Sequence, residues 1–410
     1  MTILKSANSM SGAQRFYILV VALFSVNFLA YGNLISILGC ALLLVFCRTL
    51  EVPRSSLFLW FYLLAAAYPS CAVLFGGITG MTTSLFLVGI GIASSYLLGN
   101  MALRLFPNCT PSVFVLLVCF GFAAHGTLNF VANILSGTGG SGQCIDFWTK
   151  GYSAATAQAI LFTPLTAIMW AVLLAKRKRL LKIVTLIVMV AALYYDFMLG
   201  GRSFFILIAI SGLITLAVKL CNVNKSIFDA TKSAALIFVL CVGAFALYQA
   251  DFLSLKSSFE TSYMAHRFSY QGVGDDDRSQ RWLYYIAHFS EGIFGGNVIG
   301  STSGYGYAHN LWLDTFDEAG LLPLLLLLLI AVQSIAKTIQ VASRSDEFEQ
   351  SILLSFLIIL MIQFFVEPVM QGSPLLFMVF AYFCGLIDRQ SNRLAKKVTR
   401  LENNEDQLQR

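Results

Sequence analysis

The chain has 410 residues, of which 58% are hydrophobic and 12% charged, and its formal net charge is +6. Its mean hydropathy of +0.76 exceeds what a water-soluble globular domain of this length tolerates, which excludes soluble enzymes and soluble binding modules. Apolar runs of roughly 15 to 25 residues recur, and alternating strands of about ten residues do not. The pattern therefore indicates a helical membrane protein and not an outer-membrane barrel.

The predicted fold is all-α, a polytopic transmembrane bundle of about 12 spans, because roughly 20 apolar residues cross a bilayer as a helix. The first two spans are short and only Gly32 and Asn33 separate them, so one span fewer is also open. In chain order, the apolar cores of the predicted spans are Phe16 to Tyr31, Leu34 to Cys47, Ser56 to Leu74, Met81 to Phe106, Ser112 to Asn133, Ala155 to Ala175, Leu180 to Leu199, Ser203 to Leu220, Ser233 to Ala250, Leu311 to Ile335, Gln350 to Val366 and Leu375 to Asp388.

The longest polar interruption follows the ninth predicted span, which predicts one large extracytoplasmic loop between spans nine and ten. The chain then divides into four parts. They are an N-terminal transmembrane bundle (1–250), an extracytoplasmic loop that carries the candidate site (251–310), a group of C-terminal transmembrane helices (311–388) and a cytoplasmic tail of mixed charge (389–410).

The basic residues of short loops stay on the cytoplasmic side of a membrane, so their positions predict the orientation. With both termini in the cytoplasm, all but six of the 27 Lys and Arg residues fall on that side. The exceptions are Lys150, Arg202, Lys256, Arg267, Arg278 and Arg281. The positive charge is thus scattered over helix ends beside an anionic leaflet, which predicts contact with the lipid bilayer and gives no indication of a nucleic-acid partner.

A glycine pair and an arginine stand at the predicted outer start of the eighth span. Arg202 follows Gly200 and Gly201 and precedes the apolar stretch SFFILIAI. The glycines would let a bulky anionic headgroup approach the backbone, and an arginine near a helix N-terminus adds a fixed fork of donors. A phosphate or pyrophosphate would suit this position, although an interfacial arginine that reaches lipid phosphates is the alternative. Asp196 could pair with Arg202 in either case.

Two further arginines lie three residues apart in the stretch DDDRSQRW, so a helix there would place Arg278 and Arg281 on one face. Together they could clamp a polyanionic headgroup, while Trp282 lies against a sugar ring or the membrane interface. The preceding acidic run, Asp275 to Asp277, could simply cap this helix.

His309 follows the GYGYA stretch and precedes the apolar run that re-enters the membrane. Its imidazole should therefore lie at the outer water boundary, with a neutral form near pH 7 that can accept a proton from an attacking hydroxyl. The polar residues that could orient it or line a cleft are Asn310, Asp314, Asp317 and Glu318. The alternative is a plain interfacial residue. The same plain interpretation applies to His125, His266 and His288.

An arginine shortly before a tryptophan, then a glycine-rich stretch, then His309, Asn310 and, further on, Gly320 form one pattern in a late extracytoplasmic loop. In a protein with about 12 spans, this pattern resembles the O-antigen ligase and polymerase superfamily. The GGRS segment is similar to the arginine-bearing segment of that family. The resemblance covers the topology of the whole chain, but its motifs lie only in Asp196 to Ser203 and Arg278 to Pro323.

Enzymes of this family use a polyprenyl-pyrophosphate-linked oligosaccharide on the periplasmic face and transfer its sugar to an acceptor hydroxyl. The resemblance implies that Arg202, Arg278 and Arg281 hold the donor pyrophosphate while His309 assists the attack. Pyrophosphate is already a good leaving group, so the scheme needs no cofactor and no metal. No candidate for a covalent glycosyl-enzyme stands out, which predicts inversion at the anomeric carbon.

We favour a repeat-unit polymerase, which moves the growing glycan from undecaprenyl pyrophosphate to the terminal sugar hydroxyl of an incoming lipid-linked repeat unit. A ligase motif usually has a small residue three positions after the glycine, whereas Pro323 stands there in this chain, and EPVMQGSP resembles turns of polymerases. The resemblance then implies a bacterial inner-membrane protein whose site faces the periplasm. A chain-length regulator and a flippase would be its pathway partners.

Two alternatives stay open. One is an O-antigen ligase that transfers the glycan to lipid A-core. The other is a secondary transporter or flippase, in which Arg202 and Glu367 would bind substrate or couple protons. Transporters usually carry several charges within their spans, and here the predicted spans have few.

Overall fold

A computed structural model of the chain describes residues 10–47, 53–77, 82–138, 142–176, 178–201, 203–221 and 277–408, and isolated positions between 235 and 265. It divides the chain into two compact units. Unit 1 contains Met1–Val118, Tyr284–Arg344 and Pro368–Arg410, and unit 2 contains Cys119–Leu283 and Ser345–Glu367. The units combine segments that are distant in sequence, whereas the predicted four-part division follows the chain and stays a prediction.

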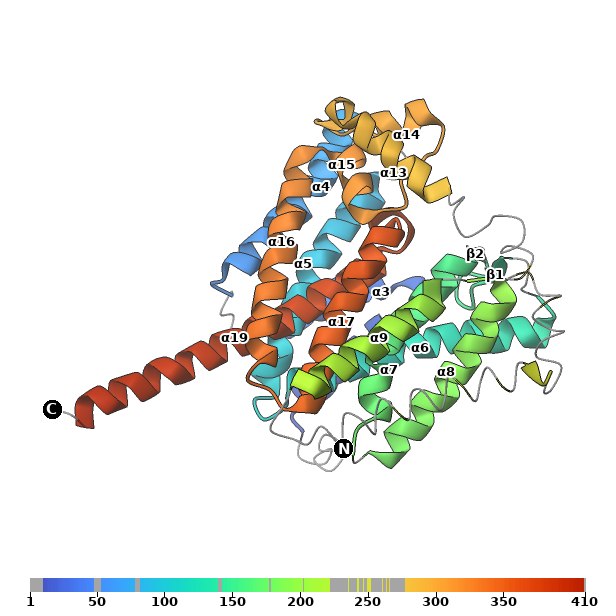
Figure 1. Cartoon of the computed structure of the whole chain (residues 1–410). Helices are drawn as coiled ribbons and strands as arrows, with labels where there is room; N and C mark the ends of the chain where they lie inside the picture. The colour runs from blue at the N-terminus through green and yellow to red at the C-terminus, as the bar shows by residue number, and fades with distance from the viewer. Residues whose placement is uncertain are drawn as a thin grey trace. The chain divides into compact units, whose positions relative to one another are not determined.

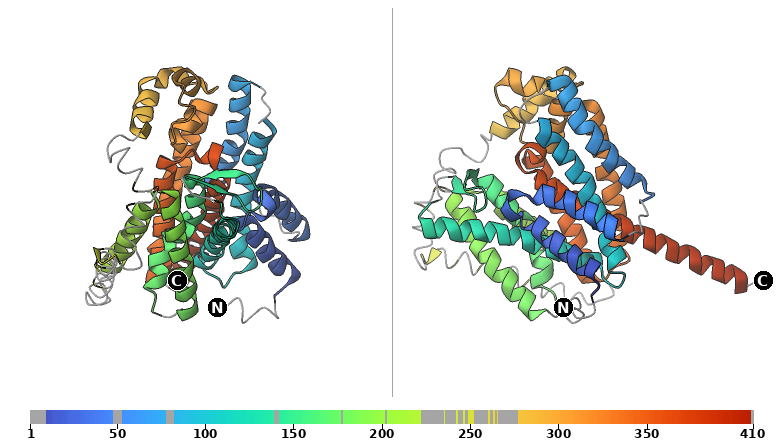
Figure 2. Two further views of the ribbon diagram at one scale, coloured as in Figure 1. Left: turned by 90° about the vertical axis from the view of Figure 1, so that its right-hand side faces the viewer. Right: turned by 180° about the vertical axis from the view of Figure 1, so that it is seen from behind.

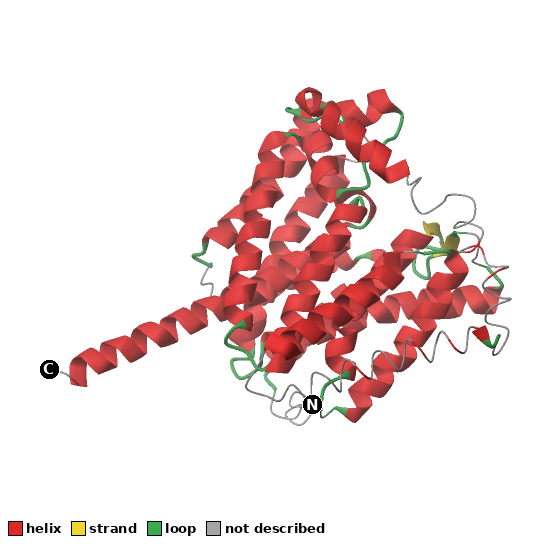
Figure 3. Cartoon of the chain, viewed as in Figure 1, coloured by secondary structure: helices red, strands yellow, loops and turns green. Residues whose placement is uncertain are grey.

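Unit 1 is built almost entirely from helices, as Figures 1 and 3 show. Its longer helices are α2 (Gly12–Ser25), α3 (Gly32–Cys47), α4 (Ser56–Gly76), α5 (Thr82–Leu105), α16 (Leu321–Ala342) and α19 (Pro374–Leu408). Helix α19 is one continuous helix, as Figure 2 shows. Its short elements are η2 (Phe28–Ala30), η4 (Phe289–Gly292), α14 (Val298–Ser303), α15 (Leu311–Ala319) and α18 (Val369–Gly372). Helices α6 (Pro111–Ser136) and α13 (Asp277–Ala287) each have one end in unit 1 and the other in unit 2.

Unit 2 packs its helices around α7 (Ala155–Leu173), most of whose residues are buried. The helices against it are α8 (Arg179–Leu199), α9 (Ser203–Cys221) and α17 (Glu347–Val366). A small antiparallel hairpin of β1 (Gln143–Ile145) and β2 (Tyr152–Ala154) precedes α7, with Cys144 opposite Ser153.

Within the described residues, eight helices are long and apolar enough to cross a membrane: α4, α5, α6, α7, α8, α9, α16 and α17. Helices α2 and α3 are apolar but shorter. The prediction of a multi-pass helical membrane protein is therefore confirmed. The count of about 12 spans and the single large outer loop stay predictions, because Ser233 to Ala250 and residues 252–276 lie largely outside the described residues.

The first two apolar segments are separate helices, but the break between them is not where the sequence placed it. Helix α2 ends at Ser25 and α3 begins at Gly32, so the predicted linker residues Gly32 and Asn33 belong to the first turn of α3. Asn27 has a left-handed backbone with φ 51°, and its side-chain oxygen accepts the Gly32 N–H at 3.0 Å. This asparagine, which tolerates the left-handed region, makes the turn.

The helices α5 and α19 of unit 1 pack closely against each other, and glycine permits this contact. A Cβ on Gly99 would overlap the carbonyl oxygen of Tyr382, and one on Gly385 would overlap that of Tyr96. Small residues let membrane helices approach in this way, since van der Waals packing must drive their association where hydrophobic burial cannot.

A buried ion pair lies along the same contact. Asp388 of α19 has no exposed surface, and its carboxylate accepts hydrogen bonds from Lys337 of α16 at 2.8 Å and from Tyr96 of α5 at 2.7 Å. The Ser55 hydroxyl, at the N-cap of α4, donates a further bond at 2.8 Å. Because a buried charge is tolerated only when it is paired and hydrogen-bonded, this carboxylate ties four helices together.

We expect Gly385→Ala to destabilise the protein by about 1–3 kcal/mol, because the new methyl group overlaps a backbone carbonyl that cannot move without displacing α5. The matched control is Gly12→Ala, at a helical glycine where the added methyl group would have no neighbouring atom within 4 Å, and this variant should be neutral or slightly stabilising. Denaturant titration of the purified variants measures both effects. Equal stability of the two variants would contradict the close approach of α5 and α19.

Candidate functional site

Arg202 lies outside the described residues, but the turn before it is defined. Gly200 caps α8 in the left-handed conformation with φ 77°, and the Gly201 N–H donates to the Asp196 carbonyl at 3.0 Å. A Cβ on Gly201 would overlap the Asp196 carboxylate. The fold therefore requires a glycine at 200 because of the positive φ, and a glycine at 201 because the Asp196 side chain approaches closely.

Asp196, predicted as a supporting residue, is buried with 1% of its surface exposed. Among the described residues, neither of its carboxylate oxygens has a hydrogen-bond partner. A buried carboxylate is costly without a partner, so this position favours a role for Asp196 beside Arg202 or beside a ligand. The predicted pairing of Asp196 with Arg202 stays a prediction.

Arg278 forms an ion pair with Glu367 within unit 2. Its Nη2 lies 3.4 Å from Glu367 Oε1, and the two side chains are 27% and 3% exposed. Glu367 follows the last residue of α17 and caps its end. An arginine carries several N–H donors in a planar fork, so a single long contact to a carboxylate leaves the guanidinium able to bind an anion as well.

Burial raises the pKa of Glu367 to about 7, even though the Arg278 guanidinium opposes that change. The carboxyl group therefore titrates near neutral pH, at a position just beyond the end of a membrane span. Groups with pKa values moved toward neutrality are concentrated at functional sites, which marks this pair as a candidate.

Arg281 and Trp282 lie on α13, as predicted, and both are partly buried. The helix begins at Asp277, so this residue stands in its first turn, while Asp275 and Asp276 lie outside the described residues. The prediction that Arg278 and Arg281 share one helical face holds, because they are three residues apart in a continuous α-helix.

His309 has a left-handed backbone, with φ 56°, directly before α15. The amide N–H groups on both sides of it donate to one carboxylate, that of Asp314. The Ala308 N–H lies 2.6 Å from Oδ1 and the Asn310 N–H lies 2.8 Å from Oδ2. Asp314 is 3% exposed, so this clamp is buried while the His309 side chain is only partly so.

The predicted supporting residue Asn310 caps α15. Its side-chain oxygen accepts the N–H groups of Trp312 at 3.0 Å and Leu313 at 3.3 Å. Asparagine is among the best N-cap residues, since it satisfies amides that have no partner within the helix. Asn310 and Asp314 together fix the backbone that carries His309.

The other two carboxylates of α15 hold different parts of unit 1. Asp317 accepts the N–H groups of Ile299 at 2.8 Å and Gly300 at 2.9 Å. Glu318 accepts a bond from the Tyr68 hydroxyl of α4 and another from Gln371 at 2.5 Å. The sequence placed these acidic residues near His309 as orienting groups, and the structure shows them anchoring the surrounding backbone and helices.

Burial raises the pKa of all three carboxyl groups, and it raises that of Asp314 to about 7 although two backbone N–H groups act in the opposite direction. Three acidic residues in one short buried helix are a concentration of charge with a large desolvation cost. The protonation of Asp314 is therefore coupled to the backbone geometry at His309.

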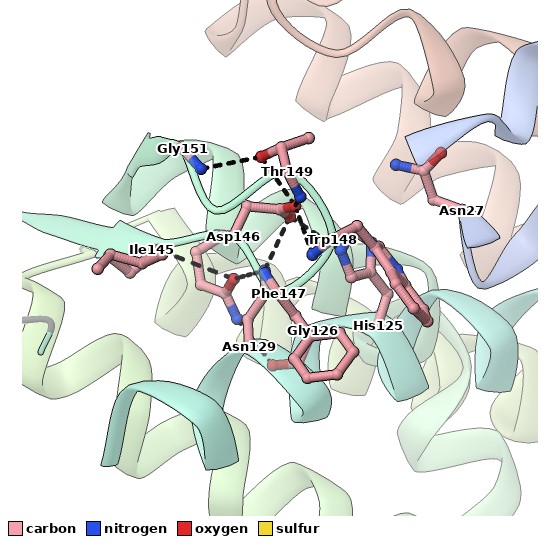
Figure 4. Close-up of polar contacts among 12 residues, drawn as sticks. Asn27, His125, Gly126, Asn129, Ile145, Asp146, Phe147, Trp148, Thr149 and Gly151 are labelled. Atoms are coloured by element: carbon pink, nitrogen blue, oxygen red, sulfur yellow. Dashed lines mark hydrogen bonds and ion pairs between the residues drawn. The ribbon is translucent and has the colours of Figure 1, made fainter. Parts of the chain in front are cut away.

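The sequence missed a second polar cluster, which lies in unit 2 and is drawn in Figure 4. His125 of α6, for which the sequence suggested no role, is 2% exposed, and its Nε2 lies 2.9 Å from Asp146 Oδ2. The other oxygen of Asp146 accepts the N–H groups of Trp148 at 3.0 Å and Thr149 at 2.8 Å.

Two asparagines of α6 complete this cluster. The side-chain oxygen of Asn129 accepts the Phe147 N–H at 2.8 Å, and that of Asn133 accepts the Ile145 N–H at 2.8 Å. His125, Asn129 and Asn133 follow one another at four-residue spacing, and that polar stripe on an apolar helix was the signal available in the sequence.

Burial alone would raise the pKa of Asp146, but hydrogen bonds from His125 and Thr149 outweigh it and hold the pKa well below its usual value. Because the Asp146 carboxylate accepts several hydrogen bonds from its own loop, it acts mainly as an anchor for residues 145–149.

No protein-family model matches this chain, and no curated protein or solved structure matches it. Among the residues that the structure describes, no group of three or more His, Cys, Asp and Glu side chains could hold a metal ion. The functional assignment therefore depends on the residues and geometry of this chain alone.

We expect Asp314→Asn to speed hydrogen exchange of the Ala308 and Asn310 amides by about tenfold or more, because an amide oxygen replaces a charged acceptor. Asp317→Asn is the matched control and should instead speed exchange at Ile299 and Gly300. Hydrogen exchange read by mass spectrometry separates the two segments. If either variant changed both segments equally, the separate roles of these carboxylates would be refuted.

The raised pKa of Glu367 predicts a pH-dependent stability. Between its ordinary value of 4.5 and about 7, the unfolded chain ionises this group while the folded protein keeps it protonated, so the free energy of unfolding falls as the pH rises. Compared with Glu367→Gln, the wild type should lose on the order of 3 kcal/mol between pH 4.5 and pH 8. Unfolding titrations at several pH values measure this difference.

The exposed carboxylate Glu291 supplies the control, and Glu291→Gln should leave the wild-type pH dependence unchanged. A Glu367→Gln profile parallel to that of the wild type would show that Glu367 does not titrate in this range.

Proposed function

We propose that the protein is a membrane glycosyltransferase that polymerises lipid-linked glycan repeat units, with His309 as its general base. The observation that most supports this is the backbone clamp around His309. A left-handed backbone at a residue other than glycine is strained, and such strain persists where the surrounding structure imposes it. Strained residues of this kind concentrate at active sites. His309 is one of eight described residues other than glycine with a positive φ, and the amides on both sides of it are held by the buried carboxylate of Asp314.

In the proposed reaction, the attacking hydroxyl is the terminal sugar hydroxyl of an incoming lipid-linked repeat unit. His309 accepts its proton as the new glycosidic bond forms to the anomeric carbon of the growing glycan. The bond from that carbon to undecaprenyl pyrophosphate breaks, and the pyrophosphate leaves with the electron pair. Attack from the face opposite the leaving group inverts the anomeric centre.

The arginines stabilise the charge that develops on the pyrophosphate. We assign this role to Arg202, Arg278 and Arg281, since guanidinium groups bind phosphate oxygens in a bidentate fashion. The ion pair between Arg278 and Glu367 supports the assignment of Arg278, because it fixes a cation next to the end of a membrane span. The reaction needs neither a metal nor a cofactor in this scheme.

The setting that suits this reaction is the bacterial inner membrane, with the site on the periplasmic side and both termini in the cytoplasm. The donor and the incoming repeat unit are both lipid-linked, so the bilayer is the source of both substrates. A flippase would supply the repeat unit, and a chain-length regulator would limit the product.

A secondary transporter or flippase is the second candidate, and one observation favours it. Glu367 is buried, is paired with Arg278 and titrates near neutral pH, which are properties of proton-coupling carboxylates in transporters. Asp196, a carboxyl group buried within a span, would be a second candidate for proton coupling.

Deletion of the gene from its parent cell, followed by complementation with wild type or His309→Ala, tests the polymerase. We expect the wild type to restore a ladder of surface polysaccharide on a gel, and His309→Ala to give lipid A-core that carries a single repeat unit. His288→Ala is the matched control, because this histidine stacks on Tyr284 in the same segment and should leave the ladder intact.

Other outcomes contradict the proposal. Bare core with accumulating lipid-linked polymer would identify a ligase, and an unchanged ladder in the deletion strain would favour the transporter. Full activity of His309→Ala at normal protein levels would remove the general-base role.

A further inference from the structure

Large apolar side chains are exposed on a segment that lies outside every candidate membrane span of the described residues. This segment, residues 283–298, contains the end of α13, η4 and the start of α14. Leu283 and Phe294 are each 68% exposed and Ile286 is 60% exposed. A soluble surface rarely carries such a group of side chains, so the apolar face requires an apolar neighbour.

The exposed side chains of α13 lie on one face of that helix. In α13, Leu283 and Ile286 are three residues apart and both are exposed, whereas Tyr285 is 1% exposed and donates its hydroxyl to the Gly306 carbonyl at 3.2 Å. In η4, Phe289 stacks on Phe316 of α15 with the ring centroids 3.9 Å apart. The segment is therefore amphipathic, with one side packed on unit 1 and the other bare.

The segment is fixed to the ends of two membrane spans. The Leu321 N–H, at the start of α16, donates to the Ile293 carbonyl at 2.9 Å. The Phe294 ring packs on Phe75, near the end of α4, with centroids 5.6 Å apart. The end of α4 and the start of α16 both contact this segment, so the segment lies at the boundary of the bilayer.

The bare face is also continuous with surfaces of those spans that meet lipid. Leu74 and Phe75 of α4 are 74% and 46% exposed, and Leu322 of α16 is 56% exposed. Exposed apolar side chains within membrane spans contact acyl chains. Because Phe294 extends this surface directly through Phe75, the same lipids can cover both.

We propose that residues 283–298 lie in the interfacial layer of the bilayer, with Leu283, Ile286 and Phe294 inserted among the lipids of the leaflet where α4 ends and α16 begins. Amphipathic helices that lie in the plane of the interface bury their apolar face to about 5–10 Å in this way. This inference does not depend on the proposed glycosyltransferase activity.

The arrangement has a consequence for α13. Arg281 stands five residues before Ile286 on the same helix, a rise of roughly 7.5 Å. Because this helix lies in the plane of the interface, Arg281 stays in the same layer as Ile286, and its long side chain can reach the lipid phosphates, where a lipid-linked pyrophosphate would also lie.

Fluorescence quenching by brominated lipids tests the proposal in the full-length protein. A fluorescent amino acid is encoded at position 286 or 294, and the protein is placed in nanodiscs made from phosphatidylcholine with or without bromine on the acyl chains. Position 74, at the lipid-facing end of α4, is the reference within lipid, and position 301, an exposed serine of α14, is the reference in water. Position 294 is the decisive site, because an aromatic probe there replaces an exposed phenylalanine.

We expect quenching at positions 286 and 294 to reach at least half of that at position 74 and to exceed that at position 301 severalfold. Quenching equal to that at position 301 would overturn the proposal. Energy transfer between two differently labelled copies, with no quenching by lipid, would instead show that a second copy of the chain covers this face, and would also overturn it.

Discussion

The structure of this protein depends on one constraint, that polar backbone groups inside a bilayer must find their hydrogen-bond partners within the protein. Helices meet this need along their length, and their ends do not. In this chain, asparagine side chains accept hydrogen bonds from backbone amides at the starts of helices. Asn27 does so before α3 and Asn310 does so before α15. Between α13 and α16 the chain changes direction several times, and His309 lies in this stretch.

Three buried acidic side chains among the described residues accept hydrogen bonds from backbone amides or from the side chains of other helices. Asp314 and Asp317 each bind two backbone N–H groups, and Asp388 binds a lysine, a tyrosine and a serine. Burial raises the pKa of Asp314 and Asp317, and the hydrogen bonds from backbone N–H groups only partly offset this change. A site built on such groups has a geometry that is sensitive to protonation, and His309 is held by one of them.

The proposed polymerase and the alternative transporter make different use of the same residues. In the first, the guanidinium of Arg278 binds a pyrophosphate, and Glu367 orients it. In the second, the carboxyl group of Glu367 carries the proton, and Arg278 adjusts its affinity. The clamp around His309 has a direct role in the first scheme and none in the second, which is why the polymerase is preferred.

The sequence by itself determined that the chain crosses a membrane as helices, because apolar length is a local property that each segment carries independently. It also indicated that Arg278 and Arg281 share one face if their segment is helical, and it began the tenth span at Leu311, where α15 begins. It did not predict the break at Gly320, which divides the predicted span Leu311 to Ile335 into α15 and α16. Only the tertiary structure decided that Arg278 meets Glu367, that His125 meets Asp146, and that Asp314 binds the backbone on both sides of His309. These pairings depend on which elements pack together and on the conformation of each turn. The hydropathy of a single segment determines neither the packing nor the turn conformation.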